Sequence, residues 1–400
     1  MLFNIRGEMI SFIDQYYNVN RKLLKIMGLW PYEKWRCRIF QITLFPSVLI
    51  SFLIAQLATF ITSKFNVNLM LTVFSQAFPC LIYFLTYISF LLNNKQIKIF
   101  FERLRYEWMT LKATDEIDIL RKYADFSRLF TVTMTVLMLL VLNSFGLFQF
   151  LPNLLDIIIP LNESRERHFT FLAEYFVDQK QYFYFILTHN LMAVYIGAIS
   201  ILSTGTMLMG FIMHICAMLK IASYRLEHIN DNLPSVSKSE KDCIICKRII
   251  NAVDIHRRAL EFGEYIISSF SKLYFILIGV GVASLTINMF QLLQLMMFTN
   301  DTNGMLACGL LVIAHFCYMF IGNLVGQVVT DHNSDILTTT YAVQWYTISL
   351  QAQKLLLFIM QRNTKNYYFT LGSIFVASLE GFASMTSMTV SYFTMIYSTR

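Results

Sequence analysis

Charged residues are scarce in this 400-residue chain, because Asp, Glu, Lys and Arg together make up only 14% of it. A soluble domain is closer to one quarter charged, since its surface has to face water. Pro occurs 6 times and Gly 15 times, which excludes collagen-like and low-complexity disordered chains. Hydrophobic residues, by contrast, make up 56% of the chain, and Phe alone occurs 36 times. The composition therefore indicates an integral membrane protein, whose apolar surface is covered by lipid.

Sequence motifs for catalysis and metal binding are also missing. The chain lacks H-E-x-x-H, G-x-S-x-G, G-x-x-x-x-G-K-[ST] and an EF-hand loop. Among seven cysteines there is one C-x-x-C, Cys243 to Cys246, without the second ligand pair that a zinc site requires. The net charge of +7 is spread in clusters between apolar segments, which argues against nucleic acid as a partner. We expect neither an enzyme nor a metal or cofactor site.

Seven segments are candidates for membrane-spanning helices, which need about 20 predominantly apolar residues each. Six are clear, and the seventh is weaker because it is rich in Ser and Thr and contains Glu380. A charged group against lipid is costly, so this last helix is expected to face protein or water. We predict an all-α membrane protein with seven transmembrane helices at 39–61, 69–92, 129–151, 182–212, 265–298, 305–329 and 367–397.

The distribution of Lys and Arg predicts the orientation of these helices. The segment before Arg38 holds six, and the loops 93–128, 213–264 and 330–366 hold eight, eight and three. The alternate loops and the C-terminus together hold five. Because Lys and Arg collect in cytosolic loops, we predict an inverted topology, with the N-terminus in the cytosol and the C-terminus outside. Two N-x-[ST] sequons, at Asn162 and Asn300, both fall in loops assigned outside, and Asn162 is the expected glycosylation site.

Two cytosolic segments carry apolar residues at helical spacing. In 241–262 the stripe is Ile245, Ile249, Val253 and Leu260, and in 334–362 it is Tyr341, Trp345, Ile348, Ala352, Leu355 and Ile359. These helices either lie on the membrane surface or bundle with copies from other subunits, and the near-heptad spacing favours the bundle. The expected organisation is a cytosolic segment 1–38, six transmembrane helices in 39–329 with the cytosolic loop 213–264, a cytosolic anchor helix in 330–366, and a final transmembrane helix in 367–400.

Short motifs in the second half of the chain resemble those of the insect odorant receptors. Ser-Tyr-Arg-Leu-Glu at 223–227 follows the fourth span, and Phe375-x-x-Ser378 precedes Phe-Ala-Ser at 382–384. Ser-Tyr-Phe at 391–393 completes the pattern near the C-terminus. The gustatory receptors of the same superfamily end in Gln-Phe where this chain has Thr399 and Arg400. The resemblance covers nearly the whole chain, including its length and topology, and favours the odorant branch.

This resemblance implies a ligand-gated, nonselective cation channel, assembled as a heterotetramer with the olfactory co-receptor Orco in the plasma membrane of olfactory sensory neurons. The final helix of each subunit would line the pore, and the cytosolic helices would hold the subunits together. Ile396 and Tyr397 would form the gate, and the residues expected to line the pore are Ser391, Thr394, Ile396, Tyr397 and Ser398. A Tyr at 397 departs from the small aliphatic gate of the co-receptor, which argues against a homomeric pore.

The ligand is expected to be a small volatile odorant bound in the outer half of the membrane, among the second to sixth spans. Such a pocket needs an apolar wall with a few polar groups. The residues expected to line it are Phe74, Phe78, Phe148, Tyr184, Asn190, Gln291, His315 and Tyr318. For His315, a satisfied polar group in the core is the simpler alternative.

Three other classes of membrane protein remain open from the sequence. A G-protein-coupled chemoreceptor would need the N-terminus outside and a Pro in its last helix, which the seventh span lacks. A transporter would show two similar halves with broken helices, and no such repeat is visible. A gustatory-receptor-like channel differs mainly at the C-terminal motif.

Overall fold

The computed structural model describes residues 15–64, 66–158, 169, 171–231, 237–298, 302–364 and 367–398. Nearly all of them are helical, which confirms the predicted fold class of an all-α membrane protein. The elements are α2 (Asn18–Ile26), α3 (Trp35–Thr62), α4 (Val67–Leu92), α5 (Asn94–Thr110), α6 (Thr114–Ile158), α7 (Phe183–Glu227), α8 (Lys238–Phe298), α9 (Thr302–Ala342), the 3-10 helix η1 (Trp345–Thr347), α10 (Leu350–Asn363), β1 (Thr370–Leu371), β2 (Phe375–Val376) and α11 (Leu379–Ser398).

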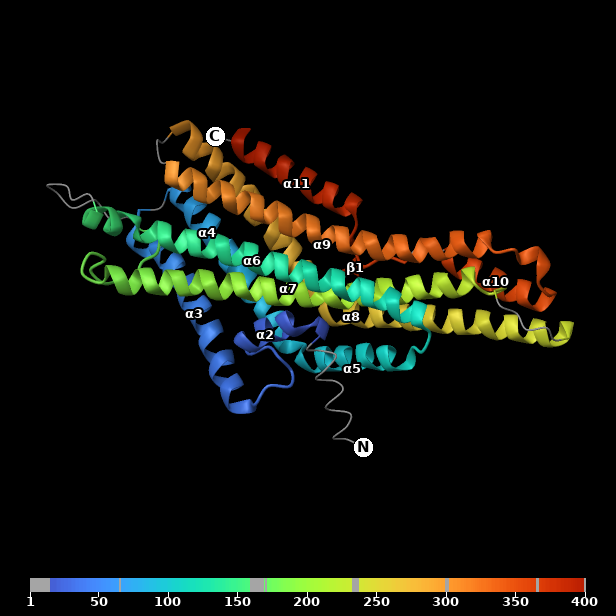
Figure 1. Ribbon diagram of the computed structural model, residues 1–400. Coiled ribbons are helices and arrows are strands. Elements are labelled where there is room, and N and C mark those ends of the chain that lie inside the picture. The colour runs from blue at the N-terminus through green and yellow to red at the C-terminus, as the bar shows by residue number, and fades with distance from the viewer. Residues whose placement is uncertain are drawn as a thin grey trace.

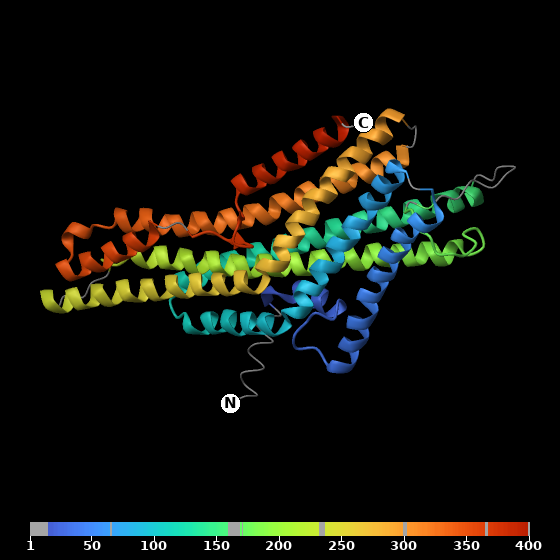
Figure 2. The same cartoon turned by 180° about the vertical axis from the view of Figure 1, so that it is seen from behind.

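Six helices, α3, α4, α6, α7, α8 and α9, are long and apolar enough to cross a membrane. The long helices α6, α7 and α9 run alongside one another with the first part of α8, whereas the second part of α8 turns obliquely away from them (Figures 1 and 2). At one end α3 and α4 cross them obliquely, and at the other end α10 folds back along α8 and α9. The C-terminal helix α11 lies on the outside of this assembly, against α8 and α9.

Helices α7 and α8 are much longer than a membrane requires. At about 1.5 Å per residue, the 61 residues of α8 extend about 90 Å, whereas the apolar part of a bilayer is about 30 Å thick. The expected cytosolic loop 213–264 is therefore mostly helix, consisting of the end of α7 and the first part of α8. The predicted helix 241–262 lies in α8, where Ile245, Ile249 and Leu260 are buried but Val253 is 38% exposed.

The expectation of one continuous cytosolic helix over 334–362 is wrong. Helix α9 ends at Ala342, η1 turns the chain, and α10 returns along α8 and α9. The predicted stripe is divided by this reversal, so Tyr341 and Trp345 are 70% and 47% exposed while Ala352 and Ile359 are buried. Periodic spacing alone does not reveal such a turn, because a stripe on two packed helices resembles a stripe on one.

The last span also begins later than expected. Residues 370–376 form a small antiparallel hairpin, in which Thr370 pairs with Val376 and Leu371 with Phe375. Gly372 and Ser373 turn it with φ values of +60° and +61°, and glycine adopts this left-handed conformation without a steric penalty. Helix α11 therefore covers 20 residues, 379–398, instead of starting at 367.

Candidate ligand pocket and pore helix

Helix α11 packs on its own subunit through one apolar face. Met385 and Thr389 are buried on this face, and Met385 belongs to a small cluster with Val282 and Leu285 of α8 and Met319 of α9. Aromatic pairs extend the contact, with ring centroids 5.4 Å apart for Phe382 and Phe320, and 6.5 Å apart for Phe393 and Phe290. This apolar face is therefore buried by contacts within its own subunit.

The opposite face of α11 is polar and uncovered. Six residues recur at alternating four- and three-residue spacing, which places them on one side of a helix. All six are exposed in the subunit. We call them the polar stripe, and they are Glu380, Ser384, Ser387, Ser391, Thr394 and Ser398.

The predicted pore residues do not all lie on this stripe. Ser391, Thr394 and Ser398 do, and Tyr397 beside them is 55% exposed. Ile396 is half-buried and lies on the side of α11 that faces its own subunit. Neighbouring residues of an α-helix point about 100° apart, so Ile396 and Tyr397 cannot face one axis equally. The assignment of these residues to a pore stays a prediction.

The start of α11 is held to α9 by side-chain amides. The backbone N–H of Ser378 donates to Asn323 Oδ1 at 3.2 Å, and that of Leu379 donates to Gln327 Oε1 at 3.4 Å. Ser378 Oγ in turn accepts from the N–H of Gly381 at 3.0 Å, capping the helix. Two side-chain amides of α9 thus hold the first turn of α11 in place.

Two of the predicted pocket aromatics come together on α4. The rings of Phe74 and Phe78 stack at 5.4 Å between centroids, and Phe60 of α3 lies 5.8 Å from Phe74. Two of the eight predicted pocket residues thus lie together beside α3, and their role in a ligand pocket stays a prediction.

The predicted polar residues of α8 and α9 differ in their hydrogen bonding. His315 Nδ1 donates to the carbonyl of Leu311 at 2.8 Å, and its Nε2 lies 2.9 Å from Ser284 Oγ. Both ring nitrogens are thereby engaged, so His315 is satisfied within the core. Gln291 differs, because its Oε1 is buried and accepts no hydrogen bond within the described part of the chain. Of these two residues, Gln291 has the acceptor that a ligand hydroxyl would satisfy.

Asn190 belongs to a network that the sequence did not reveal. Tyr175, in the segment between α6 and α7, donates to Asn190 Oδ1 at 2.8 Å, and its hydroxyl also lies 2.8 Å from His189 Nδ1. His189 Nε2 lies 2.9 Å from Ser51 Oγ on α3. The same segment reaches α4, where Leu172 N–H donates to Gln76 Oε1 at 2.8 Å. This segment therefore ties α3, α4 and α7 together.

The remaining predicted pocket residues lie at the periphery or outside the described residues. Phe148 of α6 is 38% exposed, Tyr184 of α7 is 52% exposed, and Tyr318 is 37% exposed. Their place in a ligand pocket stays a prediction. Asn162, the expected glycosylation site, lies outside the described residues.

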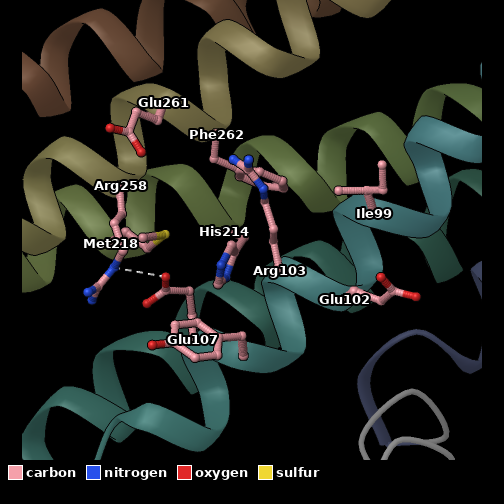
Figure 3. Close-up of a pocket in the computed structure, with 10 residues that line it drawn as sticks. Ile99, Glu102, Arg103, Glu107, His214, Met218, Arg258, Glu261 and Phe262 are labelled. Atoms are coloured by element: carbon pink, nitrogen blue, oxygen red, sulfur yellow. Dashed lines mark ion pairs between the residues drawn. The ribbon is translucent and has the colours of Figure 1, made fainter.

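A cavity of about 370 Å³ opens at a different place, between α5, α7 and α8 (Figure 3). Arg258 Nε lies 3.0 Å from Glu107 Oε1 at its wall, and both residues were unremarkable in the sequence. Burial raises the pKa of the Glu107 carboxyl above its usual range, although the Arg258 charge opposes that shift. None of the eight predicted pocket residues lines this cavity, whose lining is Ile99, Glu102, Arg103, Tyr106, Glu107, His214, Met218, Arg258, Glu261 and Phe262.

The described residues contain no group of three His, Cys, Asp or Glu side chains that could hold a metal ion. Cys243 is exposed and Cys246 is half-buried, and both are free thiols.

Several known proteins are similar to this chain in sequence or in fold. A curated relative, Odorant receptor 9a of Drosophila melanogaster, is 24% identical over 209 residues, and the match covers 52% of this chain and 50% of that receptor. The chain thus matches about half the length of this relative. The structure of the insect olfactory receptor OR5 from Machilis hrabei in complex with eugenol superposes with a TM-score of 0.75 at 16% identity, over 98% of this chain and 100% of that one. The structure of OR5 alone gives 0.73 with the same coverage.

The two OR5 structures share the fold of this chain over nearly its whole length. The family model of the 7tm odorant receptors matches residues 66–390, which is most of the chain. This chain belongs to the 7tm odorant receptor family.

Proposed function

We propose that this protein is an odorant-gated, nonselective cation channel subunit that works with the olfactory co-receptor Orco in the plasma membrane of olfactory sensory neurons. Its family membership and its likeness to OR5, whose structure was solved with eugenol, support this proposal. A small apolar or weakly polar volatile is the expected ligand.

The polar stripe of α11 carries the channel half of the proposal. Lipid does not stabilise a row of hydroxyl groups that begins with a carboxylate, whereas water does. The face around Met385 and Thr389 is occupied by contacts with α8 and α9, so the stripe on the opposite side is open to a partner subunit and an aqueous path. Four such helices around an axis would surround a hydrated pore, with Orco supplying the helices that this chain does not.

The odorant half of the proposal places the ligand near the Phe74 and Phe78 stack and the unsatisfied Gln291 Oε1. Apolar walls would supply most of the binding free energy, and one unpaired acceptor would favour ligands that carry a hydroxyl. The proposed orientation is inverted, with α11 beginning on the cytosolic side and ending outside.

Expression with and without Orco, followed by recording of cation current against an odorant panel, tests this function. Cysteine variants at 391, 394, 397 and 398 extend the test, because thiol reagents should alter odorant-evoked current where the side chain lines the path. Phe393→Cys, on the packed side of α11, is the matched control. Surface-expressed variants whose current ignores the reagents at all four positions would contradict a pore role for α11.

Tags at the two ends of the chain test the topology separately. Antibody staining of intact cells should detect only a C-terminal tag, and an accessible N-terminal tag would contradict the inverted orientation.

A further inference from the structure

Glu380 is the only charged side chain in residues 367–398. It lies in the first turn of α11 and is exposed in the subunit. Within the described residues its carboxylate forms no ion pair. A bare carboxylate on an otherwise apolar span is expensive in lipid, and such residues generally face water and mark ion pathways.

The position of Glu380 on α11 shows which way its side chain points. It is the first member of the polar stripe, four residues before Ser384, and therefore points away from the face that Met385 and Thr389 bury. Figure 1 shows α11 on the outside of the subunit, and all members of the polar stripe are exposed in the part of the chain that the structure describes. The carboxylate consequently lies in line with the hydroxyl groups of the stripe.

Helix capping does not account for this carboxylate. An acidic residue in the first turn of a helix often compensates the unpaired N–H groups there. Here three of those groups are already satisfied, since those of Ser378 and Leu379 donate to amides of α9 and that of Gly381 donates to Ser378 Oγ. The carboxylate is therefore left free to act on ions that pass along the stripe.

We infer that Glu380 forms a cation-attracting site at the inner mouth of the pore and favours divalent over monovalent cations. This inference rests on the proposed function, because α11 must line the path for Glu380 to act on it. A carboxylate attracts a divalent ion with twice the energy that it exerts on a monovalent ion at the same distance. Acidic rings of this kind set selectivity in cation channels. Removing one charge about 6 Å from the ion path, in a water-like dielectric, should lower the ratio of Ca²⁺ to Na⁺ permeability about threefold.

The test measures this permeability ratio from reversal potentials of odorant-evoked current, with the full chain and Orco expressed together. Glu380→Gln should lower the ratio about threefold while leaving odorant potency unchanged. Glu380→Asp retains the charge and should retain most of the ratio. Asp118→Asn, an exposed acidic residue on α6 far from the stripe, is the matched control and should change neither quantity.

A second variant distinguishes a charge effect from a local structural one. Glu380→Cys should lower the ratio as Glu380→Gln does, and a negatively charged thiol reagent should restore it. An unchanged ratio in Glu380→Gln, with current present, overturns the inference and leaves the proposed channel function intact. Equal losses in the Gln and Asp variants also overturn it, since the charge would then be irrelevant. Absence of odorant-evoked current from the wild-type complex would instead overturn the proposed function.

Discussion

Helix α9 packs tightly against the segment that leads into α11 at Gly326. A Cβ added to Gly326 would lie 2.7 Å from the Cβ of Ala377, and the carbonyl oxygen of Ala377 would be closer still. Ordinary carbon–carbon contacts are about 3.5–4.0 Å, so residue 377 would have to retreat by about 1 Å. Gly322, one turn earlier on the same helix, has no atom within 4 Å of the same hypothetical Cβ.

Gly326→Ala should therefore destabilise the protein relative to Gly322→Ala. Forcing a methyl group into a closely packed site costs about 1–3 kcal/mol. Alanine also gains about 1 kcal/mol over glycine in a helix interior, and both variants share this gain. Taking Gly322→Ala as the reference removes the propensity effect, which leaves about 1–3 kcal/mol for the clash.

Thermal unfolding of the purified protein in detergent measures this difference, with both variants prepared in parallel. Because Ala377 directly precedes the amide-held start of α11, Gly326→Ala should also reduce odorant-evoked current per surface channel, and Gly322→Ala should not. A Gly326→Ala protein as stable as Gly322→Ala, with equal current, would refute the close approach and the coupling inferred from it.

Four further predictions concern the Glu107–Arg258 pair, the expected odorant pocket and the hydrogen bonds of Tyr175. Arg258→Met should destabilise the protein by about 3–5 kcal/mol, because it leaves the buried Glu107 carboxylate unpaired, as measured by thermal unfolding. Burial raises the pKa of Glu107 in the folded protein above its ordinary value of 4.5, so the folded state binds a proton on this carboxyl more tightly than the unfolded state does. The free energy of unfolding should therefore fall as the pH rises above 4.5. Glu107→Gln should lack this contribution to the pH dependence of stability. Phe78→Ala and Tyr318→Ala should each weaken odorant binding by about 1–3 kcal/mol in dose–response curves, and unchanged potency in both would place the pocket elsewhere. Tyr175→Phe removes the hydroxyl from two contacts and should cost about 1–3 kcal/mol in thermal stability, whereas stability equal to wild type would show that the segment between α6 and α7 is held by other contacts.

The sequence alone determined the membrane class, the six clear spans and the periodicity of the last helix. These features depend on local composition, because a run of about 20 apolar residues has no other stable setting than lipid or a large core. Part of the polar stripe, Ser391, Thr394 and Ser398, was expected from the sequence to line the pore. The tertiary structure was needed to identify the opposite face, containing Met385 and Thr389, as the one that packs against α8 and α9.

Other features were decided by contacts between segments far apart in the chain. The turn at η1 divides the expected cytosolic helix because α10 packs back on α8 and α9, and this pairing is not written in either segment alone. Glu107 and Arg258 are 151 positions apart, so their pairing exists only once α5 and α8 are packed. Tyr175 likewise meets His189 only because its segment folds back over α7. Hydropathy and residue spacing identify the apolar face of each helix. Which other helix covers that face is determined only when the helices pack together.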